Sequence, residues 1–218
     1  MAKGLTRATV IKKALEIVDR DGLDALSMRK LGTELGVDPM AAYRHLPNKE
    51  ALLDGVMEAV VTEIDLQTDA TLPWQEQLRQ LIAADLRAML AHPNVLPLLA
   101  QRPLTTPDSL KLVERALEIL EDAGVPTHDA LLAINVMGFL IINQAIAMSA
   151  AATDSRSSED LFAVFSSLPR EDFPRIIRAL ETKQFIENYD QLLGFWTNAL
   201  IAQLERAAEA AAGSPTSE

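Results

Sequence analysis

The side chains best suited to chemistry in this sequence gather in one stretch, residues 26–53, which reads LSMRKLGTELGVDPMAAYRHLPNKEALL. Arg29 carries a guanidinium, whose parallel N–H donors match the O6 and N7 acceptors of guanine. Tyr43, Arg44 and Lys49 add a phenol and two cations, which are groups that bind phosphate oxygens. These residue types and their clustering indicate binding of a nucleic acid rather than catalysis.

Motifs of enzymes and metal sites are absent from the sequence. The chain has no cysteine, which removes thiol nucleophiles and thiolate zinc ligands. Its three histidines, His45, His92 and His128, lie far apart and lack the spacing of metal ligands. No glycine-rich phosphate loop, zinc-protease HExxH motif or serine-hydrolase GxSxG motif occurs. We therefore predict no catalytic residue, no metal site and no cofactor.

The same stretch has the pattern of two short helices joined by a tight turn. Ser27 can cap the first helix and Gly36 can end it. Asp38 can cap the second helix, which has a proline at its first position and ends near Pro47. The second helix can be brief because in a helix-turn-helix only its first turns reach base edges. Asn48 can cap the helix that follows.

Charge is distributed unevenly along the chain. Residues 1–50 contain nine lysines and arginines against seven acidic residues, a net charge of +2. The whole chain has a net charge of −11, so that residues 51–218 carry −13. An acidic total argues against nucleic acid only when it is uniform, and here the N-terminal end favours contact with phosphates.

Helical periodicity dominates the chain and no convincing strand pattern occurs, so that we predict an all-α fold. No signal peptide is visible, and the absence of cysteine suits a cytoplasmic protein. Longer helices are expected at 49–64, 74–91, 109–123, 127–152 and 188–212, with shorter pieces at 96–101, 159–165 and 173–182 and a disordered tail at 213–218.

Residues 130–153 contain no charged residue and are long enough to cross a membrane. Asn135, Asn143 and Gln144 lie in the middle, where a bilayer penalises polar groups most. Three alternatives are open: burial against a second subunit, burial within one subunit, and a membrane span. We prefer a homodimer without a membrane, because the wide apolar stripe of residues 189–204 suits a helix bundle shared by two protomers.

Residues 7–60 resemble the DNA-binding region of the tetracycline-repressor (TetR) family of bacterial transcription regulators. The resemblance continues more weakly toward the tetracycline-repressor branch over most of the chain. It implies a helix-turn-helix domain at 1–50, a connecting helix at about 48–65, and a ligand-binding and dimerisation domain at 66–212. The residues that carry it are Ala14, Leu15, Gly22, Leu26, Ser27, Met28, Arg29, Lys30, Leu31, Leu35, Gly36, Val37, Tyr43, Arg44, His45, Leu46, Asn48, Lys49, Leu52 and Leu53.

The resemblance implies roles for individual residues of the DNA-binding region. Arg29 would read a base, Tyr43 would contact a backbone phosphate, and Lys49 would bind phosphate beside the exposed amides of its helix start. Tyr43 could instead fill the junction between two helices, and His45 could be a packing residue. The DNA-binding set predicted in this way is Ser27, Arg29, Met40, Ala41, Tyr43, Arg44, His45 and Lys49, in which Met40 and Ala41 replace more polar base-reading residues and Arg44 replaces a frequent aromatic residue.

The resemblance also implies an effector pocket in the C-terminal half. Arg102 and Pro103 match the Arg–Pro pair of the tetracycline-binding members. Leu98 and Leu99 stand where those members have a histidine that helps to hold a magnesium–drug complex. We therefore expect a largely apolar organic effector that needs no metal and is oriented by one or two hydrogen bonds. The candidate ligand-binding residues are Asp85, Arg102, Asn135 and Phe139.

Taken together, these patterns predict a homodimeric, ligand-responsive transcription regulator. We predict a repressor that binds a palindromic operator in double-stranded DNA as a homodimer and is released by a small apolar organic effector. The alternative is a helical sensor or adaptor that dimerises through the same helices and does not bind DNA. Asn135, Asn143 and Gln144 could serve either the ligand or the dimer interface.

Overall fold

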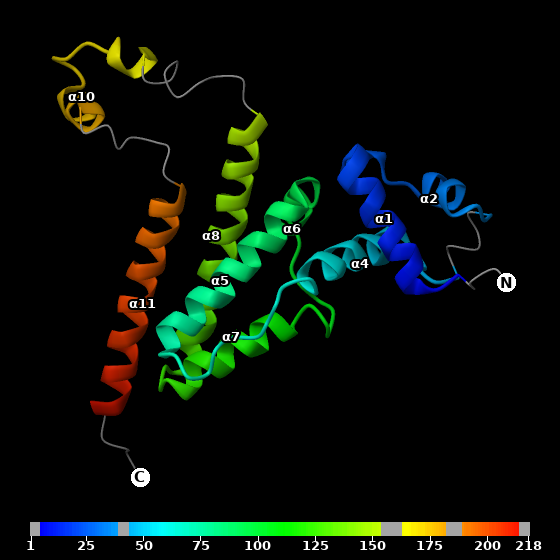
Figure 1. Cartoon of the computed structure of the whole chain (residues 1–218), viewed down its shortest axis with the longest axis horizontal. Coiled ribbons are helices and arrows are strands. Elements are labelled where there is room, and N and C mark those ends of the chain that lie inside the picture. The colour runs from blue at the N-terminus through cyan, green and yellow to red at the C-terminus, as the bar shows by residue number, and fades with distance from the viewer. Residues whose placement is uncertain (1–4, 39–43, 154–162, 182–188, 214–218) are drawn as a thin grey trace.

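A computed structural model of the chain describes residues 5–38, 44–153, 163–181 and 189–213. Within these ranges every regular element is a helix, which confirms the predicted all-α fold. Figure 1 shows a small group of helices, built by residues 7–61, at one end of the molecule. A larger group of longer helices lies beside it.

The helices of the N-terminal group hold one another through a shared apolar core. Their buried side chains include Ile17, Leu26, Leu31, Leu46 and Leu52. The elements are α1 (Arg7–Asp21), a 3-10 turn η1 (Leu23–Ala25), α2 (Met28–Leu35) and α4 (Lys49–Val61).

The helix ends in this group agree with the sequence pattern. The Ser27 hydroxyl accepts a hydrogen bond from the Lys30 amide at 3.2 Å, and the Asn48 side chain accepts one from the Ala51 amide at 2.8 Å. Gly36 ends α2 at φ 67°, a left-handed conformation that glycine adopts without steric cost. These caps fix where α2 and α4 begin and hence where their first basic residues lie.

The predicted second helix of the pair falls largely on residues 39–43, which lie outside the described residues. The sequence also places Arg44 and His45 on that helix, whereas in the structure they form a turn. Pro47 disfavours helical backbone at Leu46, the residue before it, so a helix does not continue beyond this turn.

In the C-terminal group, α5, α7 and α8 pack together and α11 runs beside α8 (Figure 1). The predicted helices occur with small shifts of their ends, although the predicted piece at 159–165 lies mostly outside the described residues. The elements are α5 (Trp74–Ala91), η2 (Pro93–Val95), α6 (Leu96–Leu99), α7 (Lys111–Asp122), α8 (Thr127–Thr153), α10 (Pro174–Glu181) and α11 (Tyr189–Gly213).

The uncharged segment forms α8, and its two faces differ. One face is buried against the rest of the chain through Ala130, Ala133, Met137, Ile141 and Ala145. We call the other the outer face of α8; its Leu132, Val136 and Phe139 are 53%, 46% and 65% exposed. Among the described residues α8 is the one helix that could cross a membrane by length and composition alone. A single chain therefore leaves a large apolar surface uncovered.

The polar residues of α8 find partners within the chain. Gln144 is buried and donates a hydrogen bond to the Tyr189 carbonyl at 2.7 Å, which ties α8 to the start of α11. The Asn135 and Asn143 amides each donate to a carbonyl one turn earlier in α8 at 2.8 Å. Gln144 is thus engaged by the fold itself.

Candidate nucleic-acid interface and the cavity behind it

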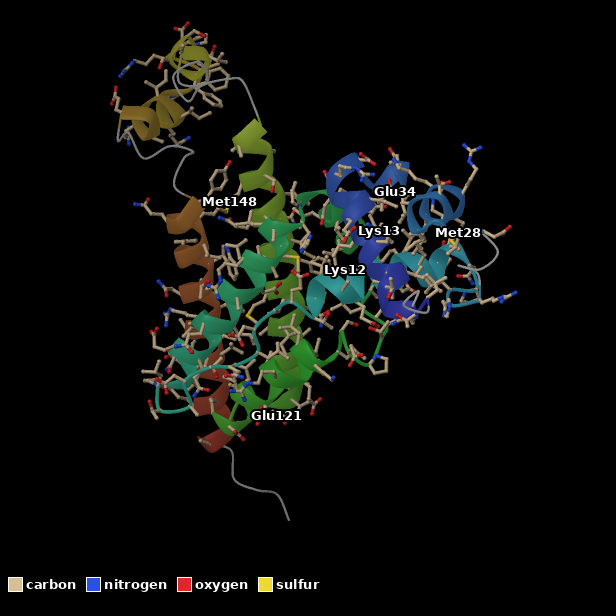
Figure 2. The ribbon with its side chains drawn as sticks, turned by 45° about the vertical axis from the view of Figure 1, so that its right-hand side comes forward. Lys12, Lys13, Met28, Glu34, Glu121 and Met148 are labelled. Carbon is tan, nitrogen blue, oxygen red and sulfur yellow. The ribbon has the colours of Figure 1, made fainter. Side chains whose placement is uncertain are left out.

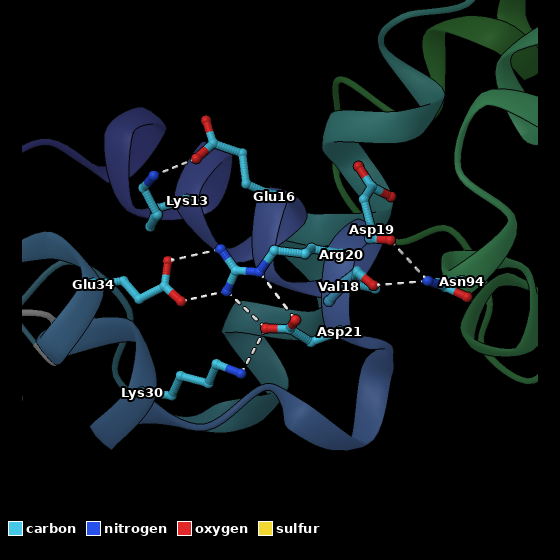
Figure 3. Close-up of polar contacts among 9 residues, drawn as sticks. All are labelled: Lys13, Glu16, Val18, Asp19, Arg20, Asp21, Lys30, Glu34 and Asn94. Atoms are coloured by element: carbon cyan, nitrogen blue, oxygen red, sulfur yellow. Dashed lines mark hydrogen bonds and ion pairs between the residues drawn. The ribbon is translucent and has the colours of Figure 1, made fainter.

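Some basic side chains of the N-terminal group are held by carboxylates. Figure 3 shows Arg20 of α1 between Asp21 and Glu34, while Lys30 of α2 reaches Asp21 at 2.6 Å. Hydrogen bonds from Arg20 and Lys30 hold the pKa of Asp21 well below its usual range. The network joins α1 to α2, so these cations support the fold and are already paired.

Arg29, Arg44 and Lys49 form a second set, which we call the free cations. All three side chains are exposed, and none forms an ion pair or side-chain hydrogen bond with a residue that the structure describes. Arg29 neighbours the paired Lys30 on α2, and Lys49 begins α4, where backbone amides without intrahelical partners favour an anion. The free cations are therefore available for phosphates or base edges.

Other members of the predicted DNA-binding set have different surroundings. The Ser27 hydroxyl is engaged as the cap of α2, and His45 is half-buried in its turn. Met40, Ala41 and Tyr43 lie outside the described residues, so that the structure places only part of the predicted set.

Behind the N-terminal group, a cavity of about 390 Å³ lies between α5, α7, α8 and residues 99–104. Its size suits a drug-sized molecule. Figure 2 shows the helices of the C-terminal group with their side chains, with Met148 of α8 labelled toward one end of the group and Glu121 of α7 toward the other. The walls are mainly leucine and isoleucine, and all four predicted ligand contacts line them: Asp85, Arg102, Asn135 and Phe139.

Asp85 is the most deeply buried polar group on this wall. Its side chain is 9% exposed and makes no hydrogen bond or ion pair within the described part of the chain. Desolvation by burial raises the pKa of Asp85 to about 7. Leu99 also lines the cavity, and Leu98 is buried, so the position of the expected histidine is filled by apolar packing.

Arg102 connects the cavity with the N-terminal group. Its guanidinium pairs with Asp54 at 2.8 Å and with Glu50, and both carboxylates belong to α4. These bonds raise the pKa of Arg102, so it stays charged. One residue thus lines the cavity and holds the helix whose first residue is the free cation Lys49.

A second connection is made by His92, at the end of α5. Its Nδ1 lies 2.9 Å from the Asp19 carboxylate of α1, and its Nε2 lies 2.9 Å from that of Glu63. Partial burial lowers the pKa of His92, but hydrogen bonds to Glu63 and Asp19 outweigh this and raise it. Asn94 donates to the Val18 carbonyl at 3.1 Å, which closes the end of α1.

Sequence reasoning missed both connections. The partners of Arg102 lie 52 and 48 residues away, and those of His92 lie 73 and 29 residues away. The only sequence feature that could have indicated these ion pairs is the opposite charge of the partners. The chain has 31 acidic residues, so charge alone does not identify which of them pairs with Arg102 or His92.

Two regions of the chain match known families. Residues 10–56 match bacterial regulatory proteins of the tetR family, and residues 68–204 match the tetracyclin repressor-like C-terminal domain. The second match alone spans more than half of the chain. This chain belongs to the TetR family. It is a ligand-responsive, DNA-binding transcriptional regulator in a family of repressors, which favours the predicted regulator over a sensor that does not bind DNA. Its relatives are regulators rather than enzymes.

Individual TetR-family proteins are similar over most of their length. An HTH-type transcriptional regulator of Saccharopolyspora erythraea is 31% identical over 171 residues, which are 76% of this chain and 72% of the relative. The tetracycline repressor protein class D of Escherichia coli is 28% identical over 195 residues, with coverages of 85% and 82%. The structure of ActR from Streptomyces coelicolor in complex with actinorhodin matches with a TM-score of 0.85 at 26% identity, covering 94% of this chain and 99% of ActR.

Proposed function

We propose that this TetR-family protein is a cytoplasmic homodimeric repressor that binds a palindromic operator and releases it when a small organic effector enters the cavity. The observation that carries the proposal is the double role of Arg102. It lines the cavity and pairs with Glu50 and Asp54 of α4. Because α4 begins at Lys49, a shift of this wall would move the helix that presents a free cation.

The chain divides into parts that suit this coupling. We assign residues 1–50 to the DNA-binding domain, about 48–65 to the connecting helix, and 66–212 to ligand binding and dimerisation. An effector can act only by binding more tightly to the dimer that is not competent for DNA. Weakening operator binding about 100-fold needs about 2.7 kcal/mol of coupling, which is within the usual range.

The free cations supply the proposed DNA contacts. Arg29 suits a guanine edge, and Lys49 with the amides at the start of α4 suits a phosphate. Arg44 in the adjoining turn is exposed and unpaired within the described chain, which supports a backbone contact. Ser27 and His45 then lie at the edge of this surface, while Met40, Ala41 and Tyr43 stay predicted contacts on the reading helix.

A second copy of the chain is the proposed cover for the outer face of α8. The exposed side chains Leu132 and Val136 lie about one turn apart and form one stripe, and Phe139 continues this stripe where it borders the cavity that it also lines. On α11, which packs beside α8, Leu192 and Phe195 are also exposed, Phe195 to 75%. Two such helix pairs facing each other would bury both stripes in a bundle without a membrane.

For the effector, the cavity supports a largely apolar organic molecule. Complexes of the similar ActR with actinorhodin and with (S)-DNPA support effector binding by this chain. Leu98 and Leu99 offer no metal ligand, so we propose that divalent metal is not required. Asp85, Arg102, Asn135 and Phe139 are the proposed contacts.

The experiment is a gel shift with the DNA upstream of the gene for this protein. Wild type should bind a palindromic site, and the affinity should fall steeply as salt increases because phosphate contacts release counterions. Scrambling one half-site should abolish specific binding. Binding that ignores both salt and half-site would overturn the proposal, and the variant Lys49→Ala should weaken binding to every sequence alike.

A further inference from the structure

The cavity of this protein contains a carboxyl group that the fold does not use. Asp85 lies in the middle of α5, is buried, and has no hydrogen-bond or ion-pair partner within the described residues. Asp85 lines the cavity, so a molecule bound there can supply the hydrogen-bond partner that buried polar side chains in native proteins nearly always have. Desolvation is the cause that raises its pKa to about 7, and no neighbouring cation offsets it.

Among the described residues that line the cavity, the one cation already has partners. Arg102 faces Glu50 and Asp54, so a single positive charge meets two negative charges. When Asp85 gives up its proton, as it does on contact with a cation, this group of four side chains carries a net charge of −2. The other described lining residues of the cavity, Asn135 apart, are apolar. These charges favour a cation in the cavity over an anion, and the low-dielectric walls strengthen that preference.

Asn135 adds a second acceptor. Its side-chain N–H donates to the Leu131 carbonyl at 2.8 Å, which leaves the side-chain oxygen for a donor in the cavity. A primary ammonium group has three N–H donors and no acceptor, so it complements one carboxylate and one amide oxygen.

We infer that the effector class is an apolar amine, bound as a cation with its ammonium group on Asp85 and its hydrocarbon part against the leucine and isoleucine walls. This inference rests on the proposed function, because it names the ligand of that cavity. A charge-assisted hydrogen bond in a buried site is stronger than a neutral one, so an amine binds more tightly than its alcohol. A carboxylate binds least, because Asp85 repels it and Arg102 is occupied.

The test uses three anthracene probes that differ in one group: anthracenemethylamine, anthracenemethanol and anthraceneacetate. Binding to the full-length protein is measured by fluorescence titration near neutral pH. The amine should bind about ten- to hundredfold more tightly than the alcohol, and the acetate should be the weakest. Asp85→Asn should remove the advantage of the amine and leave the alcohol within about threefold of wild type. Glu76→Gln, which removes an exposed carboxylate from the same helix, is the matched control and should change nothing.

The outcomes separate this inference from the proposed function. Equal affinity for the amine and the alcohol, an amine advantage that persists in Asp85→Asn, or no binding of any probe would each overturn the amine class. Operator binding by wild type and Asp85→Asn, followed in a gel shift without probe, tests the regulator independently. Asp85→Asn keeps the side-chain size and removes a buried charge, so it should fold, and its helical circular dichroism signal verifies this.

Discussion

In the N-terminal group, Arg29, Arg44 and Lys49 are charged, exposed and unpaired among the described residues, while their neighbours Arg20 and Lys30 are tied to carboxylates. In the cavity the situation is reversed. There the cation Arg102 has two partners, and the buried carboxyl of Asp85 has no partner among the residues that the structure describes.

The difference teaches how to interpret an unpaired charge. At the surface, water solvates an unpaired cation, so that its free-energy cost is small. A single such cation therefore indicates little about function. Several unpaired cations close together indicate a binding surface for a polyanion such as DNA. In a cavity, a charged group without a partner costs more free energy because it is desolvated. One unpaired carboxyl in a cavity therefore indicates a binding site as clearly as a cluster of unpaired cations does at the surface.

The largest effect is expected from a substitution that tests whether the outer face of α8 is exposed to water or buried in a dimer. Leu132→Asp places a carboxylate on a residue that is 53% exposed in one chain. If a second copy covers it, two unpaired carboxylates are buried at several kcal/mol each, and the dimer should dissociate and lose operator affinity by more than about 100-fold. Sedimentation measures the mass. Leu72→Asp, on an exposed leucine of the loop between α4 and α5, is the control. A dimer that survives Leu132→Asp would place this face in water.

The next effect concerns the stability contribution of Asp85. With a native pKa near 7 against an ordinary value of 3.8, the unfolded chain loses this proton first as pH rises. The free energy of unfolding should therefore fall between about pH 4 and 7, by about 1.4 kcal/mol per unit from this group. Urea unfolding of Asp85→Asn should show this slope reduced. An unchanged slope would mean that Asp85 is paired or hydrated in solution.

A smaller effect compares two adjacent cations on α2. Arg29→Ala should cost about 1–3 kcal/mol of operator binding and relax the preference at one base pair. Lys30→Ala removes a cation that is paired with Asp21, so base preference should stay as in wild type. Quantitative gel shifts on single-base operator variants distinguish them. A loss of preference in Lys30→Ala alone would reverse the roles of the paired and the free cation.

The smallest effect is expected at His92, whose bonds to Asp19 and Glu63 join the two groups of helices. Because its native pKa is raised, the imidazolium stabilises the fold fully below about pH 6.5, and this contribution is lost as pH rises through the native pKa. His92→Gln should lower stability by less than about 1 kcal/mol below neutral pH and have no effect at alkaline pH. Thermal melts at both pH values measure this, with the exposed His128→Gln as control.

Local structure was well predicted from the sequence, because its determinants are local. Ser27 and Asn48 cap the helices expected of them, and Gly36 ends α2 in the conformation that its lack of a Cβ allows. Arg29 could be proposed as a contact from type and position alone. The turn at Arg44 and His45 was missed because the pattern places both residues on the helix that it predicts before Pro47.

Tertiary relations were predictable only in part. Asp85 and Asn135 could be proposed as cavity residues because a polar side chain in an apolar helix needs a partner. Their shared wall with Arg102 emerges from the packing of α5, α7 and α8. The pairing of Arg102 with Glu50 and Asp54 spans distant segments, and no periodicity encodes it.

Arg102 lines the cavity and also binds α4, and this arrangement affects how the ligand specificity of such a protein can change. The bonds that reach Glu50 and Asp54 are made by its guanidinium, while the apolar walls of the cavity are supplied by other residues. Substitutions in those walls can change which molecule fits and leave the link to α4 intact. A biosensor designer can therefore randomise Leu81, Ile134 and Met137 for a new analyte and retain the output of the parent regulator.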